Sequence, residues 1–317
     1  MLPLAYTESF DLKERLRSVD ALRAQLLSIP LSPKNEMKFR WEARATRVHS
    51  SLTLAHTLFS RGQIVKILSS HTKHVPSDYR DVLAYDTALS YIEECWTANT
   101  KPVTVGVITT LASMVLPNPK DAIDRAIASV ETPMRTTLEY LGTQHDHPII
   151  QAGIALCLSA TDAAMSLDSG VVSRLIASMY FAKYGFDCRG LLTVEKNWVS
   201  AGDAYDAAIE SHRKEGNLNS WLAFFAQSME DNLRERIEDL SDSTFHQEFP
   251  ASFWELSDRQ KSILRFLEEP TNSVTNKKVQ TMFGVSQITA SRDLSKLTTL
   301  GLIASHGKGR SISYTRT

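Results

Sequence analysis

Cysteine is scarce in this sequence of 317 residues, which contains only Cys95, Cys157 and Cys188. An odd and widely spaced set excludes a disulfide framework, and no pair has the short spacing of a zinc site. The cysteine spacing therefore predicts no metal site. Unpaired thiols are typical of a reducing compartment, so we predict a cytoplasmic protein.

Long hydrophobic runs are also missing. The most apolar stretch, Val171–Phe181, is interrupted by Arg174 and is far too short to span a bilayer. The first residues lack the basic segment and apolar run of a signal peptide, so we expect no membrane partner. The glycine-rich GxGxxG and P-loop motifs and the GxSxG nucleophile motif do not occur, and we expect no cofactor.

The two signs of charge are unevenly distributed, although the formal net charge is only −1. Ser257–Thr317 holds ten Lys and Arg against four Asp and Glu, whereas the rest of the chain holds 25 against 32. A basic end on an acidic body indicates a polyanion as a partner of that end. A basic surface that only keeps the protein in solution is the alternative that charge leaves open.

Apolar residues recur with helical spacing over residues 1–245, and few stretches alternate as strands do. This predicts a mainly α protein with a helical region at 1–75, a helical domain at 76–245, a linker at 246–256 and a small domain at 257–317. The helices predicted before the linker are Asp11–Ser28, Lys38–Phe59, Asp81–Thr97, Thr104–Val115, Lys120–Leu141, Pro148–Asp162, Ser169–Tyr184, Ala204–Arg213 and Ser220–Leu240.

The small C-terminal domain begins with a predicted helix at Ser257–Glu268. Two shorter helices follow: Thr275 caps Asn276–Phe283, and Ser286 caps Gln287–Leu300. A glycine between them, Gly284, can take the left-handed conformation that a tight turn needs. This order of caps and turns predicts a helix-turn-helix.

One face of the last helix carries Ala290, Leu294 and Leu297, which should pack on the other two helices. The opposite face carries side chains of the kinds that read base edges in the major groove. Arginine pairs with guanine, glutamine with adenine, and hydroxyls with bases or phosphate. The residues predicted on that face are Gln287, Ile288, Ser291, Arg292 and Ser295, where Ile288 either touches a thymine methyl or packs inside.

After Gly301 two short strands flank His306–Gly309 and predict a basic hairpin, the wing of a winged helix. A wing contacts phosphate, which fixes register but carries little sequence information. The further residues of the predicted DNA-binding set are Lys296, Lys308, Arg310, Thr275, Lys277 and Ser286. A winged helix that docks on a protein is the alternative.

Two blocks stand out in the helical region, HPIIQAGIAL at His147–Leu156 and the block from Ser173 to Trp198. Together with Ala88–Leu116 and Trp41–Leu68, they resemble the Fic family of helical enzymes, and the resemblance extends over about residues 38–317. The end of the chain, TASRDLSKLTTLGLI and GKGR, resembles the winged helix that many Fic proteins carry. The resemblance implies a Fic (Fido) fold for 76–245, and Fic enzymes typically transfer AMP from ATP to a hydroxyl of a target.

The family signature, His-Pro-Phe-x-Asp/Glu-Gly-Asn-Gly-Arg-x-x-Arg, falls without gaps on Ala163–Arg174 (AAMSLDSGVVSR). Only Gly170 and Arg174 match it. Ala163 stands where the resemblance places the general base, and Leu167 where it places the Mg²⁺ ligand. After Leu167, the first Gly, the Asn and the first Arg positions of the signature hold Asp168, Ser169 and Val171.

These replacements remove the chemistry that the signature supplies. Alanine cannot accept a proton, and leucine offers no oxygen to Mg²⁺. Asp168, at the start of the helix predicted from Ser169, would cap the N–H groups that otherwise bind phosphate and would repel a triphosphate. Arg174 leaves one cation there, or forms an ion pair with Asp168 or another local acid.

Two further family features are also absent. The family's inhibitory Ser-x-x-x-Glu-Gly motif falls on Ser50–Ala55 (SSLTLA), which lacks the glutamate and the glycine. The segment between Leu116 and His147 lacks the Gly-x-Tyr/Trp-Arg run of the substrate-aligning flap.

We therefore predict a catalytically inactive Fic-like protein that binds double-stranded DNA as a homodimer and regulates transcription. Its body would serve dimerisation or the sensing of an unknown small-molecule effector. Residual nucleotide binding or AMP transfer, and a role as a protein adaptor, are the alternatives.

Overall fold

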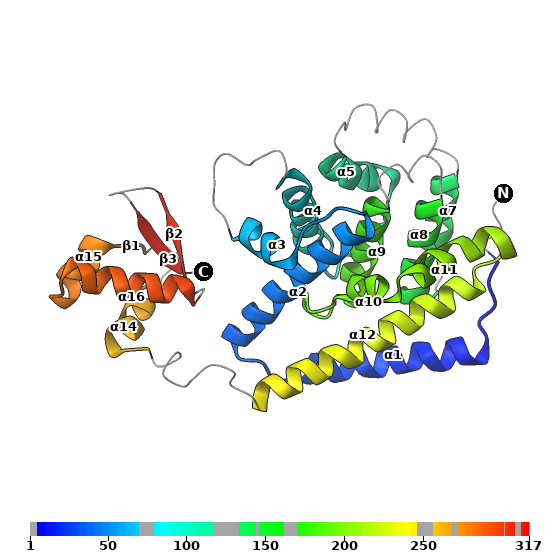
Figure 1. Cartoon of the computed structure of the whole chain (residues 1–317). Helices are drawn as coiled ribbons and strands as arrows, with labels where there is room; N and C mark the ends of the chain where they lie inside the picture. Colours follow the sequence, from blue (N-terminus) through cyan, green and yellow to red (C-terminus); the bar gives the residue numbers. More distant parts are fainter. Residues whose placement is uncertain are drawn as a thin grey trace. The chain divides into compact units, whose positions relative to one another are not determined.

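The structure is a computed structural model that describes residues 5–69, 79–116, 133–143, 146–161, 170–245, 256–267, 272–300, 302–307 and 312–316. The chain divides into two compact units, unit 1 at Met1–Asp242 and unit 2 at Ser243–Thr317. The prediction of a mainly α protein is confirmed, since strands occur among the described residues only as short pieces of unit 2 (Figure 1). No described helix is both long and apolar enough to cross a membrane.

Unit 1 is built around helix α9, Val171–Tyr184, which packs against α8, α4, α5 and α2. Every residue of α9 from Val172 to Ala182 is buried, because the helix is enclosed on all sides. The other helices described in unit 1 are α1 Phe10–Ser28, α2 Pro33–Leu54, α3 Arg61–Leu68, α4 Arg80–Trp96, α5 Val105–Val115, α7 Pro133–Thr143, α8 Pro148–Thr161, α10 Val194–Ala201, α11 Asp203–Glu215 and α12 Asn219–Phe245.

The first and last long helices of this unit, α1 and α12, lie side by side (Figure 1). Glu230 of α12 accepts hydrogen bonds from Arg15 Nη1 and Ser18 Oγ of α1, each at 2.7 Å. Arg23 of α1 donates to the carbonyl of Gly185 and lies over the Phe186 ring, just beyond the end of α9. The apolar side of α1 thus joins the same hydrophobic core as α8 and α9.

Several helices differ from the predicted boundaries. Helix α2 begins at Pro33 instead of Lys38, because Ser32 caps it and proline suits the first helical position. It ends at Leu54 instead of Phe59, and α3 follows where no helix was predicted. Helix α10 was also not predicted. Of the helix predicted at Lys120–Leu141, residues 120–132 lie outside the described part of the chain, as does most of the predicted linker.

Unit 2 contains α14 Asp258–Phe266, β1 Val274–Thr275, α15 Asn276–Phe283, α16 Gln287–Thr299, β2 Ile303–His306 and β3 Ser313–Arg316. The strands form an antiparallel sheet in the order β1-β3-β2, in which Val274 pairs with Tyr314 and His306 with Ser313. Strand β1 is one that the sequence did not predict. Its core consists of Ile263, Leu267, Val274, Val279, Ala290, Leu294, Leu297 and Ile303.

Candidate functional site

Helix α16 begins at a cap that the sequence predicts. The Ser286 hydroxyl accepts from the backbone N–H of Thr289 at 3.2 Å, and the Thr275 hydroxyl accepts from that of Lys278, which starts α15 in the same way. Between the two helices Gly284 has a φ of +61°, in the left-handed region where glycine carries no steric penalty. The inward face of α16 is as predicted, since Ala290, Leu294 and Leu297 are fully buried.

Two polar side chains that sequence reasoning missed fix α16 to its neighbours. Asn276 of α15 donates through Nδ2 to Ser291 Oγ at 2.7 Å and to the carbonyl of Gln287 at 3.2 Å. Asp293, which is buried, accepts from Arg259 Nε at 2.5 Å and from Gln260 Nε2 at 2.8 Å, both on α14. The orientation of α16 in unit 2 is therefore set by hydrogen bonds from both other helices as well as by its apolar face.

The outward face of α16 has the composition that the sequence predicts. Gln287, Ser291, Arg292 and Ser295 are exposed, and the Ile288 side chain is 66% exposed and so does not pack inside. Ser291 accepts from Asn276, which leaves its own O–H free to donate outward. The face thus offers an amide, two hydroxyls, a guanidinium and one apolar side chain.

The residues predicted to contact phosphate are placed in part. Lys277 is exposed and Lys296 is half-buried, on α15 and α16 respectively. Thr275 and Ser286 accept backbone N–H groups as helix caps, and Ser286 Oγ also shares a hydrogen bond with Thr289 Oγ1 at 3.0 Å. Lys308 and Arg310, at the predicted tip of the wing, lie outside the described residues.

In unit 1 the described part of the degenerate signature is Gly170, Val171 and Arg174; Ala163, Leu167, Asp168 and Ser169 lie outside it. Gly170 precedes α9 with a φ of +77°, and a Cβ there would lie 2.8 Å from Arg174 Nη1. Arg174 is buried and donates from Nε to Ser51 Oγ and from Nη2 to the Ser51 carbonyl, each at 2.8 Å. The arginine retained from the family signature is thus hydrogen-bonded to helix α2, within the segment on which the inhibitory motif falls.

A second buried arginine lies on α2. Arg47 Nε is 3.3 Å from Glu195 Oε1 of α10, and Arg47 Nη2 donates to Ser178 Oγ of α9 at 2.8 Å. Burial, followed by the Glu195 carboxylate, raises the pKa of the nearby Tyr85 to about 12. This network ties α2 and α10 to α9. Among the residues described, no group of three His, Cys, Asp or Glu could hold a metal ion.

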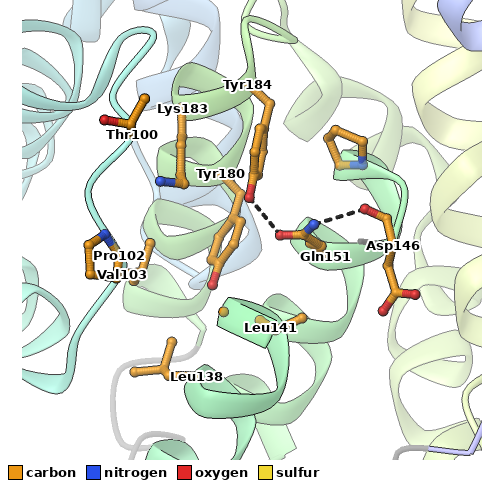
Figure 2. A pocket seen from close by; sticks show the side chains of 12 residues that line it. Thr100, Pro102, Val103, Leu138, Leu141, Asp146, Gln151, Tyr180, Lys183 and Tyr184 are labelled. Atoms are coloured by element: carbon orange, nitrogen blue, oxygen red, sulfur yellow. Dashed lines mark hydrogen bonds between the residues drawn. The ribbon is translucent and has the colours of Figure 1, made fainter. Parts of the chain in front are cut away.

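A cavity of about 400 Å³ lies in unit 1, at the C-terminal end of α9. Figure 2 shows Lys183 and Asp146 on either side of Tyr180, Tyr184 and Gln151. Tyr184 donates to Gln151 Oε1 at 2.8 Å, and burial lowers the pKa of Lys183. The remaining lining residues are Thr100, Pro102, Val103, Leu138, Leu141, Gly142 and Pro148. No sequence motif indicated this cavity, because its lining comes from four separate segments.

Solved structures with a similar fold include Fic proteins. A Fic family protein from Desulfovibrio desulfuricans G20 matches 98% of this chain and 97% of its own, with a TM-score of 0.62 and 14% identity. A fragment of Fic-1 from C. elegans matches 71% of each chain, with a TM-score of 0.57 and 17% identity. No protein-family model and no curated protein matches the sequence. The chain therefore has the helical fold seen in Fic family proteins.

Proposed function

We propose that this chain is a transcriptional regulator that binds double-stranded DNA through α16 and carries a Fic-fold body without transferase activity. The observation that supports DNA binding is the exposed face of α16, where Gln287, Ser291, Arg292 and Ser295 project from a capped helix start. An α-helix fits the major groove, and these side chains are hydrogen-bonding partners of base edges there.

The rigidity of α16 suits this role. Base reading needs side chains held at fixed positions relative to the phosphates that set the register. Asn276 and Asp293 hold the helix on two sides. Of the outward side chains, only Ser291 bonds to either of them, and it does so as the acceptor from Asn276. We propose that the chain acts as a homodimer, because one small winged helix buries little surface and paired half-sites add their binding energies. The proposed location is the cytoplasm.

Selection of duplexes from a random pool by the full-length chain tests the proposal. We expect one short motif to be enriched, arranged as two half-sites whose spacing reflects a two-fold dimer. The measurement is repeated across salt concentrations, because phosphate contacts make affinity fall steeply with salt. If no duplex is enriched over the starting pool, the chain is not a sequence-specific DNA-binding protein, and the adaptor alternative gains support.

The proposed loss of activity rests on residue chemistry. Ala163 and Leu167 stand at the positions of the base and the metal ligand, and neither side chain can accept a proton or bind Mg²⁺. In the described region, Arg174 already hydrogen-bonds Ser51 in the protein interior.

Incubation of the full-length chain with labelled ATP and Mg²⁺ is expected to leave no label on the chain or on proteins of a lysate. An active Fic enzyme run alongside shows that the assay works. Transfer of label by the wild-type chain, lost in an Arg174→Ala variant that still folds, would contradict the inactive body and favour the residual-enzyme alternative.

The cavity at the end of α9 favours a second candidate function, the sensing of a small molecule by the body. Lys183 Nζ donates to the carbonyls of Asn99 and Lys101, which leaves one of its three N–H groups for a ligand. Val103, Leu138 and Leu141 supply apolar walls. A small carboxylic acid with an apolar body has the matching chemistry, a charged end for Lys183 and a hydrophobic remainder.

A thermal-shift screen of small aliphatic and aromatic carboxylic acids tests this second function. An acid that binds should raise the melting temperature of the wild type, since a ligand of the native state stabilises it by mass action. Lys183→Met should abolish the shift, and Lys101→Met, an exposed neighbour, should keep it. If no acid raises the melting temperature, or Lys183→Met responds like the wild type, the cavity does not sense carboxylates.

A further inference from the structure

Ile288 is the most exposed large apolar side chain among the described residues of unit 2. Its side chain is 66% exposed, whereas the other exposed one there, Met282 of α15, is 40% exposed. Ile288 lies in the first turn of α16, directly after Gln287. Ser291 and Arg292 follow it at three and four positions, the spacings that place helix residues on one face. An apolar group therefore stands inside an otherwise polar, basic face.

From this placement we infer that Ile288 recognises the C5 methyl group of a pyrimidine in the major groove. The inference rests on the proposed function, which lays this face of α16 in that groove. The exposed base edges there are hydrogen-bond donors and acceptors, apart from the C5 methyl of thymine. An isoleucine has nothing to offer a donor or an acceptor, but it can exclude water from a methyl group.

The shape of the side chain supports the assignment. Isoleucine is branched at Cβ and has one strongly preferred χ1 rotamer in a helix, so little freedom is lost when it meets a methyl group. Because it lies between Gln287 and the pair formed by Ser291 and Arg292, it contacts a base next to those that they read. The preferred half-site therefore contains a methylated pyrimidine next to the base read by Arg292.

Two pyrimidines carry this methyl group, thymine and 5-methylcytosine, and the experiment separates them. After selection, each thymine of the enriched motif is replaced singly by uracil, which lacks only the methyl group. At one thymine of each half-site we expect wild-type affinity to fall about fourfold, the effect of removing one buried methyl-sized group. A second set of duplexes places cytosine or 5-methylcytosine at that position. Tighter binding of 5-methylcytosine than of cytosine shows that the methyl group itself is read.

The variant Ile288→Ala should bind the thymine and uracil duplexes equally at that position. Met282→Ala, which truncates the other large apolar residue exposed in the described part of unit 2, should retain the fourfold preference of the wild type. Both variants should melt like the wild type, since both side chains are exposed. The expected result is thus a preference for the methyl group that depends on one side chain.

Each other outcome has its own meaning. If a motif is enriched but wild type and Ile288→Ala respond alike to uracil at every thymine, the inference is wrong and the proposed DNA binding stands. If Ile288→Ala changes the oligomeric state without DNA, as measured by light scattering, Ile288 packs against a second copy of the chain, and the inference is again wrong. Failure to enrich any duplex instead removes the proposed function itself.

Discussion

Replacement of Glu195 by alanine is expected to lower the free energy of unfolding of unit 1 by about 3–5 kcal/mol, the usual result of leaving a buried charge without its partner. The Arg47 and Glu195 side chains are only 7% and 2% exposed. Burial is the largest influence on the pKa of Arg47 and works to lower it, but Glu195, Tyr85 and Glu93 together outweigh burial, so the pKa is raised. Without that carboxylate the guanidinium stays buried with far less compensation. Urea unfolding followed by the fluorescence of the buried Trp198 and Trp221 measures the change.

Glu235→Ala is the matched control. Glu235 pairs with Lys196, the neighbour of Glu195, but these two side chains are 31% and 46% exposed. Water screens such a pair, so its loss should cost less than about 1 kcal/mol. A double variant, Arg47→Met with Glu195→Leu, should regain much of the lost stability, because apolar residues can replace a buried ion pair. Equal losses for Glu195→Ala and Glu235→Ala would show that the buried pair does not stabilise the body.

The long helices of unit 1 could be predicted because each repeats its apolar residues over several turns. The eight-residue helices α3 and α10 could not, because two turns hold too few apolar residues to show a period. A signal was present at α3, where Ser60 and Gln63 form a capping box. Strand β1 has two residues, Val274 and Thr275, and only its partner β3 defines it.

For the candidate interface, the sequence predicted the caps and the two faces of α16. A cap depends on residues three positions apart, and a helix face on residues three or four positions apart. The partners of Asp293 are 33 and 34 positions away on α14, and only the packed unit brings them together. Arg174 shows the same limit. The structure shows it hydrogen-bonded to Ser51, 123 residues away, a contact that the sequence did not indicate. Contacts of this range follow from the tertiary fold and not from a motif.

Replacement of Arg292 by alanine is expected to weaken binding of the selected duplex by about 1–3 kcal/mol and to relax the preference at one base pair, as for an arginine that pairs with guanine. The side chain is exposed, so the melting temperature should not change. Lys277→Ala is the informative comparison, because Lys277 is exposed on α15 and is predicted to contact phosphate. It should weaken all sequences alike and reduce the slope of affinity against salt by about one. Titrations of the motif and of its single-base variants, at several salt concentrations, separate these two effects. If Arg292→Ala instead lowers the affinity for every variant equally, Arg292 contacts phosphate, and base reading by α16 must come from Gln287 and the hydroxyls of Ser291 and Ser295.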